Sequence, residues 1–295
     1  MRKSIEYFEQ SIEKDPHYAL AYAGLSDSHN LLGYLGIAPP KEAFPRSEAA
    51  AVKALELDDS LSEAHLSLAK VKLFYDWDGP GFESEVKRSL DLDSNYADAH
   101  GMYGTYLLAI GRFNESIAER KRALELDPLS PLGNTSVGWS YFYARRYEDA
   151  IEWYKKALEL DPNFVVAHNG LATAYELKGM HSEAVDAFLR AKSLTGANEQ
   201  TMGALKQAFA SSGIKGYWQK ELELAKEQQK VSPVGTQRMA TIYTELGDND
   251  HAVEWLEKGY EEHNSLLIFI NVIPTFDSLH SHPGFVDLVR RIGLH

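Results

Sequence analysis

Residues 131–162 read PLGNTSVGWSYFYARRYEDAIEWYKKALELDP, and the rest of the chain is organised around this stretch. Its apolar residues recur at helical spacing, as in Val137 and Tyr141 in the first half and Ala150 and Tyr154 in the second. This spacing places them on one face of an α-helix. The stretch therefore predicts two helices, joined by a tight turn at its Arg-Arg pair and ended by its final proline.

The segments on either side repeat the pattern in the same register. Residues 97–128 read ADAHGMYGTYLLAIGRFNESIAERKRALELDP, and residues 165–196 read VVAHNGLATAYELKGMHSEAVDAFLRAKSLTG. The prolines Pro128 and Pro162 lie 34 residues apart. Small residues recur where two helices must approach closely or where the chain must turn, and these are Gly104, Gly138, Ala123, Ala157, Ala191, Gly111 and Gly179. Copies that stay in phase indicate a helical repeat protein.

The three copies resemble the tetratricopeptide repeat, whose period is 34 residues. The resemblance implies an all-α fold, a right-handed α-α superhelix of about seven helix pairs. One pair cannot bury its apolar face alone, so stability is expected to be a sum over stacked pairs and their interfaces. The resemblance implies function only at the level of a binding surface.

The whole chain, residues 1–295, reads as a single solenoid. We expect a leading half repeat over 1–16 and a C-terminal cap over 265–295, because a solenoid must cover its last apolar face. Between them, the expected repeats are 19–60, 62–94, 97–128, 131–162, 165–196, 199–231 and 233–264.

The half repeat carries Ile5, Phe8 and Ile12 at helical spacing, so it reads as the second helix of a pair without its first. We therefore expect the sequence to be a piece of a longer protein, with Met1 added to it. The alternative is that this helix is a natural cap.

Three places depart from the regular repeat. Residues 34–45 lengthen a turn and contain Pro39-Pro40, so we expect a loop there and a helix that resumes near Pro45. The turn around Trp77 has aspartates at calcium-loop spacing, but a proline and a lysine occupy ligand positions, which excludes calcium. We expect Trp77 to pack on a neighbouring helix. Repeat 199–231 is degenerate, with its turn at Gly213.

Composition excludes several function classes. The chain has 30 basic and 43 acidic residues, a net charge of −13, which disfavours binding to nucleic acid or to an anionic membrane surface. It has no cysteine, so it has no disulfide framework. No apolar run is long enough for a membrane span, so we expect no membrane insertion and a cytoplasmic location.

The C-terminal sequence makes the resemblance to a particular group of repeat proteins more specific. Residues 273–285 read IPTFDSLHSHPGF, and the chain then ends with Arg-Arg-Ile-Gly-Leu-His. This ending is similar to that of repeat regions in bacterial and archaeal signalling proteins, as are residues 74–78 and 143–147. In those proteins the repeats follow a winged-helix, adenylate cyclase or serine/threonine kinase domain. The resemblance implies a regulatory module within a larger signalling or transcription protein.

The concave face of such a superhelix is lined by the first helix of each pair, which makes it the candidate peptide groove. Residues three and four apart share a helix face. The expected groove residues are Leu66, Lys70, Phe74, Gly101, Thr105, Leu108, Thr135, Trp139, Phe142, Tyr143, Asn169, Thr173 and Glu176. Aromatic anchors such as Trp139 and Phe142 dominate the energetics of peptide recognition. The alternative is that both rings pack across the inner wall and leave no recess.

Other kinds of site find less support in the sequence. The groove departs from the clamp by which one sub-class of the family binds C-terminal carboxylates, because Lys70 is its main cation. His65, His100 and His168 hold equivalent positions and are expected to fill helix seams rather than to bind metal. The sequence contains no phosphate loop, zinc motif or nucleophile elbow. We therefore expect no catalytic residue, no metal and no cofactor.

The sequence thus predicts a non-enzymatic module that binds a protein or peptide ligand. The alternative is an assembly module without a groove, which forms a homodimer through the uncovered N-terminal helix.

Overall fold

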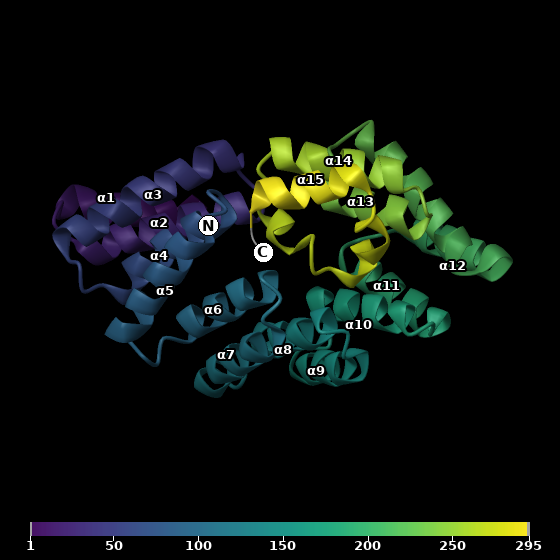
Figure 1. Cartoon of the computed structure of the whole chain (residues 1–295), viewed down its shortest axis with the longest axis horizontal. Coiled ribbons are helices and arrows are strands. Elements are labelled where there is room, and N and C mark those ends of the chain that lie inside the picture. The colour runs from purple at the N-terminus through teal and green to yellow at the C-terminus, as the bar shows by residue number, and fades with distance from the viewer. Residues whose placement is uncertain (1, 294–295) are drawn as a thin grey trace.

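A computed structural model of the chain describes residues 2–293, and within that range the fold is all-helical with no strand. Fifteen α-helices follow one another and wind into a curved superhelix (Figure 1). This arrangement confirms the fold class predicted from the repeats. Met1 and Leu294, which belonged to the expected start and to the family-like ending, lie outside the described residues.

Most helices of the described residues form antiparallel pairs with a neighbour in the sequence. The pairs are α2 (Ala19–Tyr34) with α3 (Pro40–Leu57), α4 (Ser62–Phe74) with α5 (Gly79–Leu92), α6 (Ala97–Ala109) with α7 (Phe113–Leu126), α8 (Pro131–Tyr143) with α9 (Tyr147–Leu160), α10 (Val165–Leu177) with α11 (His181–Leu194), and α13 (Thr236–Glu245) with α14 (Asn249–Glu261). The remaining elements are α1 (Arg2–Lys14), α12 (Glu199–Gln229), the 3-10 helices η1 (Ser265–Phe269) and η2 (Pro274–Leu279), and α15 (Pro283–Ile292).

The turns within the pairs lie where the 34-residue register predicts them. Gly111, Arg145 and Gly179 occupy equivalent positions and have φ angles of 75°, 59° and 75°. Glycine adopts this left-handed conformation without steric cost, whereas a residue with a side chain rarely does. Arg145 adopts it despite its side chain, so the register holds even where the glycine is missing.

The small residues of the repeat make room for a large ring. Tyr154 of α9 is fully buried, and its ring lies between Gly138 of α8 and Gly170 of α10. A Cβ atom would approach that ring to 2.6 Å at Gly138 and to 2.8 Å at Gly170. The two first helices approach each other closely because neither carries a side chain at this point.

The inserted segment is helical over more of its length than expected. α3 begins at Pro40, five residues earlier than predicted, and continues through Pro45. A proline at the first helical position is favourable because its missing N–H needs no partner there. The additional turn is held by Phe44, which is 0% exposed and stacks on Tyr75 with ring centroids 5.3 Å apart.

The degenerate repeat is present as one bent helix. α12 runs from Glu199 to Gln229, but Ser212 and Gly213 have non-helical backbone angles. Gly213 has a φ of 62° and a ψ of −156°, a conformation that an L side chain rarely adopts. The break lies at the predicted turn, and the two halves, 199–211 and 214–229, correspond to the expected helices of that repeat.

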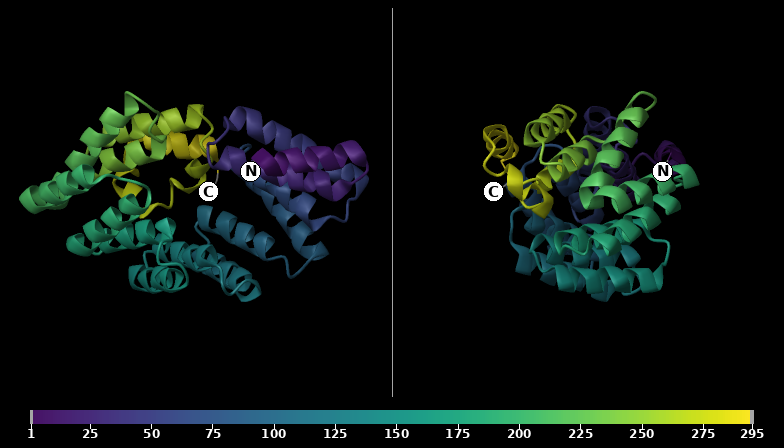
Figure 2. Two further views of the ribbon diagram at one scale, coloured as in Figure 1. Left: turned by 180° about the vertical axis from the view of Figure 1, so that it is seen from behind. Right: turned by 90° about the vertical axis from the view of Figure 1, so that its right-hand side faces the viewer.

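The superhelix turns far enough for its C-terminal part to lie beside its N-terminal pairs (Figures 1 and 2). Trp77, in the turn after α4, packs on Tyr260 of α14 in a tilted arrangement, with ring centroids 4.9 Å apart. The expected packing of Trp77 on a helix is therefore present, but the helix is distant in the sequence. A contact of this kind ties the two ends of the superhelix together.

Residues 264–280, which we call the C-terminal segment, do more than cover the last helix pair. Their η1 helix contacts α2, α4 and α6 on the inner side of the superhelix. Arg145 donates a hydrogen bond to the carbonyl oxygen of Val272 at 3.2 Å and pairs with the carboxylate of Asp277 at 2.6 Å. The segment thus crosses the concave face, while α15 packs on α14 as an end cap would.

Candidate functional site: the concave face

All of the predicted groove residues lie on the first helices of four consecutive pairs, α4, α6, α8 and α10. Their exposure differs sharply. The buried ones are Leu66, Phe74, Leu108, Thr135, Phe142 and Glu176. The partly exposed ones are Lys70, Gly101, Thr105, Trp139, Tyr143 and Thr173, and Asn169 is exposed. A role in binding remains a prediction for each of them.

The C-terminal ends of these first helices are covered by the protein's own chain. Phe74 packs against Tyr34 with ring centroids 4.8 Å apart, and Tyr143 packs against Phe269 of the C-terminal segment at 5.9 Å. Phe269 is 8% exposed, and its neighbours Ile268 and Ile270 are each 2% exposed. This half of the predicted groove is therefore filled.

The C-terminal segment packs closely against this half. Eight of its apolar side chains are buried, namely Leu267, Ile268, Phe269, Ile270, Val272, Ile273, Phe276 and Leu279. A ligand that entered this half would have to displace them.

The part of the concave face that this segment does not fill, which we call the open half, is centred on Trp139 of α8 and the equivalent positions, Thr105 of α6 and Thr173 of α10. The flanking residues Gly101, Thr105, Asn169 and Thr173 are small or short and polar. The Thr105 hydroxyl bonds the carbonyl of Gly101 at 3.0 Å, and that of Thr173 bonds the carbonyl of Asn169 at 3.1 Å. Both hydroxyls are thus turned to their own helices, and Trp139, which is partly exposed, is the one aromatic residue among these five.

Beneath this surface lies Arg120, a residue that the sequence reasoning missed. Arg120 belongs to α7, but its side chain passes over Gly104 of α6, where a Cβ atom would lie 2.6 Å from the Arg120 Cγ. The 34-residue register offered a signal, because the equivalent positions hold Tyr154 and Phe188. Arginine is seldom buried. Its presence where two other repeats place an aromatic ring therefore needs an explanation.

The guanidinium of Arg120 is held by neutral groups. It donates one hydrogen bond to the carbonyl of Ser136 at 2.5 Å and one to the hydroxyl of Thr105 at 3.1 Å. It lies 5.9 Å from the ring centroid of Trp139, a distance typical of a cation–π contact. Burial lowers the pKa of Arg120 to about 10. It stays charged at neutral pH in a place where charge is costly.

Two carboxyl groups are buried together farther along the superhelix. Burial, followed by the charge of Glu245, raises the pKa of Glu176 to about 8, and burial raises the pKa of Glu245 to about 7. Trp218 donates a hydrogen bond from its Nε1 to Glu176 at 2.5 Å. The pair joins α10 to α13, and it retains a proton at neutral pH because two close buried charges repel each other.

The equivalent histidines bind carboxylate and backbone groups. His65 and His100 each place Nδ1 against a glutamate of the following helix, at 2.7 Å from Glu85 and 2.6 Å from Glu119. His168 places Nε2 3.0 Å from a backbone carbonyl. These are the helix-seam positions that the sequence predicted. In residues 2–293, no three potential metal-binding side chains come together.

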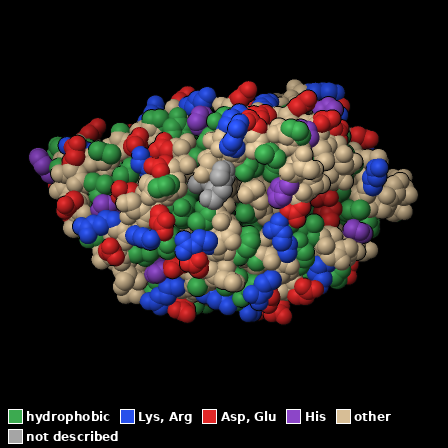
Figure 3. All heavy atoms as spheres, in the orientation of Figure 1, with side chains coloured by type: hydrophobic (Ala, Val, Ile, Leu, Met, Phe, Trp, Pro, Cys, Tyr) green, Lys and Arg blue, Asp and Glu red, His purple; other side chains and the backbone are tan. Residues whose placement is uncertain are grey.

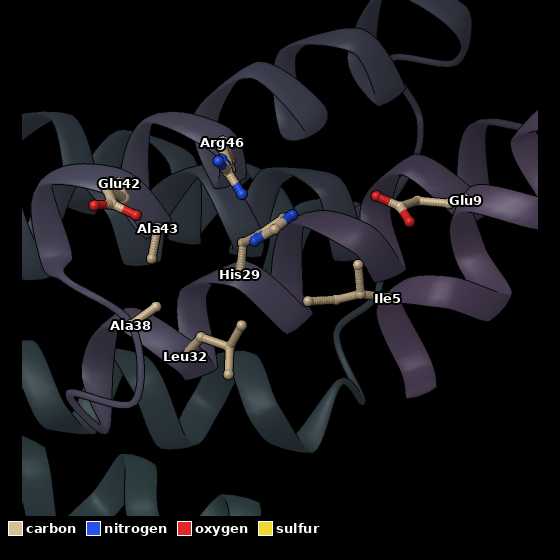
Figure 4. A pocket seen from close by; sticks show the side chains of 8 residues that line it. All are labelled: Ile5, Glu9, His29, Leu32, Ala38, Glu42, Ala43 and Arg46. Carbon is tan, nitrogen blue, oxygen red and sulfur yellow. The ribbon is translucent and has the colours of Figure 1, made fainter. Parts of the chain in front are cut away.

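A separate hollow of about 350 Å³ lies at the N-terminal end, between α1, α2 and the additional turn of α3 (Figure 4). Its lining residues are Ile5, Glu9, His29, Leu32, Ala38, Glu42, Ala43 and Arg46. Burial, and then the charge of Arg46, lowers the pKa of His29. The hollow exists because α3 begins early and raises one of its walls.

The face seen in Figure 3 carries basic and acidic side chains mixed together, with apolar side chains between them. Charge of one sign is not gathered over any large part of that face. In the described part of the chain, no helix is both long enough and apolar enough to span a bilayer.

This arrangement of stacked helix pairs is that of the tetratricopeptide repeat class, and comparison with known proteins supports the assignment. A family sequence model described as TPR repeat matches residues 138–179, and one described as tetratricopeptide repeat matches residues 237–262. The chain therefore contains tetratricopeptide repeats. Such repeats form a typical non-catalytic scaffold and generally mediate protein–protein interaction. A comparison with curated proteins finds no match.

Solved structures share the fold at low sequence identity. PilF of Pseudomonas aeruginosa is 22% identical, with a TM-score of 0.54 over 70% of this chain and 90% of its own. PilW, a type IV pilus biogenesis factor, is 21% identical, with a TM-score of 0.53 over 68% of this chain and 93% of its own. The APC/C hetero-tetramer Cut9–Hcn1 is 15% identical, with a TM-score of 0.56 over 99% of this chain and 46% of that one.

Proposed function

We propose that the chain is a protein-interaction module that binds a segment of a partner protein on the open half of its concave face. The observation that carries this proposal is the position of Trp139. Its ring is partly exposed at the middle of the face, between short polar side chains, while the chain's own C-terminal segment fills the other half. A large aromatic ring among small neighbours is the usual anchor of a binding surface.

The biological setting belongs to the same proposal. The ending of the sequence is similar to that of repeat regions that follow DNA-binding, cyclase or kinase domains. We place the chain in a larger signalling or transcription-regulatory protein of the cytoplasm. In that setting a partner bound to the concave face would regulate the attached domain. The gene sequence upstream of Met1 tests this part, because an unrelated upstream region contradicts it.

The binding proposal can be tested with selected peptides. Short peptides are selected from a random library on the intact chain, and their affinities are then measured by calorimetry for the wild type and for two variants. Trp139→Ala should weaken binding by about thirtyfold, the effect of losing a hot spot worth about 2 kcal/mol.

The matched control is Trp153→Ala, on the outer helix α9. Trp153 is also partly exposed and contacts Lys156, whose Nζ lies 3.9 Å from the ring centroid. We expect this variant to bind like the wild type. Equal affinities for the wild type and Trp139→Ala would remove the concave site.

A second candidate function is assembly through the N-terminal helix. Tyr7 of α1 is 66% exposed, and Tyr18 and Leu20 at the start of α2 are 46% and 44% exposed. A second copy could cover these side chains and make a homodimer. Sedimentation over a range of concentrations, on wild type and Tyr7→Glu, tests this candidate, and a wild-type chain that stays monomeric contradicts it.

A further inference from the structure

Arg120 is a buried cation without an acidic partner. The residue is 3% exposed, and no carboxylate among residues 2–293 forms a salt bridge with it. The side chains whose charge acts on its pKa are the phenols of Tyr34, Tyr143 and Tyr154, not acids. An uncompensated buried charge costs several kcal/mol, so a protein retains one only where something offsets the cost.

The donors around this cation are not all used. The Nε–H of Arg120 and the hydroxyl of Tyr154 are both buried and have no hydrogen-bond partner in the described structure. Native proteins leave few buried donors unpaired, because each costs about 1–3 kcal/mol. Both side chains lie against the same stretch of α8, because Arg120 bonds the carbonyl of Ser136 and the Tyr154 ring packs at Gly138. Unpaired donors near a positive charge are complementary to a small anion.

Two further phenols, those of Tyr34 and Tyr143, lie within the range of the Arg120 charge. They come from α2 and α8, and the charge of Arg120 acts on both of them. A phenolic O–H can donate a hydrogen bond to an anion. Burial raises the pKa of Tyr34 and of Tyr143, so both stay protonated and able to donate at neutral pH.

We propose that Arg120 and the hydroxyl of Tyr154 form an internal binding site for one small monovalent anion. A halide ion and a carboxylate group both carry a single negative charge and accept hydrogen bonds from N–H and O–H donors. This is the chemistry that the site recognises. Trp139 covers the guanidinium on the open side of the concave face. The site does not depend on the proposed function, since an anion can bind here whether or not a peptide binds above it.

Thermal unfolding of the intact chain tests the proposal. The midpoint is measured at constant ionic strength while chloride, or in a second arm formate, replaces a bulky sulfonate anion. We expect the wild-type midpoint to rise with saturation, because a ligand that binds only the folded state stabilises it by mass action. Arg120→Met, which keeps the length and removes the charge, should show no anion dependence.

The control is Arg122→Met on the same helix. Arg122 pairs with Glu125 at 3.0 Å on the surface, so this variant should keep the wild-type anion dependence. The proposal is overturned by a wild-type midpoint that ignores both anions, or by equal anion dependence in the wild type and Arg120→Met.

A milder variant keeps the test decisive if Arg120→Met does not fold. Tyr154→Phe retains the buried ring and removes only a hydroxyl that the protein itself leaves unpaired. Chloride affinity, measured from the broadening of the chlorine resonance on titration, should fall by about tenfold, the effect of one hydrogen bond to a charged group. Unchanged affinity in Tyr154→Phe overturns the assignment. A peptide with a free carboxylate that competes with chloride would identify the partner as the source of the anion, and one that does not would leave a free ion as the ligand.

Discussion

Trp77 and Tyr260 pack against each other at 4.9 Å between ring centroids, with their planes tilted by 31°, although 183 positions separate them in the sequence. Trp77 also stacks on His263 at 5.3 Å. Stacked aromatic pairs add about 0.5–1.5 kcal/mol beyond the area that they bury. A solenoid is normally held by contacts between neighbouring repeats. Here one turn of the superhelix brings distant repeats together, so its two ends stabilise each other.

Trp77→Ala should therefore destabilise the chain by about 2–3 kcal/mol, somewhat less than the loss of a fully buried tryptophan. The measurement is urea unfolding followed by circular dichroism. Trp77→Phe serves as the comparison, because it keeps a ring to stack and removes an indole N–H that is buried without a partner. We expect Trp77→Phe to lose less than about 1 kcal/mol. Equal losses in the two variants would mean that stacking is not what joins the ends.

Gly138→Ala should destabilise the chain by about 1–3 kcal/mol, because the new methyl group would meet the buried ring of Tyr154 at 2.6 Å. Gly203→Ala is the matched control in α12, where a Cβ atom would meet nothing within 4 Å. There the substitution should stabilise the helix by up to about 1 kcal/mol. Thermal unfolding of both variants gives the comparison, and a Gly138→Ala protein as stable as Gly203→Ala would contradict the close approach of α8 and α10.

The pair Glu176 and Glu245 should make stability depend on pH. Both carboxyl groups have a pKa above the unfolded value of about 4.3, so the folded state binds more protons than the unfolded state between these values. Their contribution is complete below about pH 4 and is lost as the pH rises through 7 and 8.

The measurement is urea unfolding of the wild type and Glu176→Gln at several pH values in that window. Glutamine can still accept the hydrogen bond from Trp218 but cannot ionise, so the variant should lose less stability than the wild type as the pH rises. Glu223→Gln on the surface of α12 should behave like the wild type. A wild type whose stability is flat from pH 5 to 9 would show that the two carboxyls are not buried together.

The repeat architecture could be predicted from the sequence because the 34-residue register fixes local features. Gly111 and Gly179 mark turns, and even Arg145 holds the turn conformation that its position demands. The closure of the superhelix could not be predicted in this way. The closure depends on the sum of the small rotations between successive repeats. The identity of a single residue such as Trp77 does not indicate which distant helix it will contact.

The candidate site was predictable only in part for the same reason. The register placed Trp139 correctly on a first helix, but it could not reveal that Tyr34 covers Phe74 and that the C-terminal segment covers Tyr143. Arg120 was missed because a charged residue on a second helix reads as solvent-facing. Only its equivalence to Tyr154 shows that the position is buried.

Phe269→Ala decides whether the C-terminal segment is part of the core or a removable cover. Phe269 is 8% exposed and packs on Tyr143, so a core role predicts a loss of about 3–5 kcal/mol in urea unfolding. Leu129→Ala, at a residue that is 75% exposed, should change stability by less than about 0.5 kcal/mol. A removable cover predicts instead that Phe269→Ala leaves global stability nearly unchanged and speeds hydrogen exchange only in residues 264–280. We expect the first outcome, because eight apolar side chains of this segment are buried.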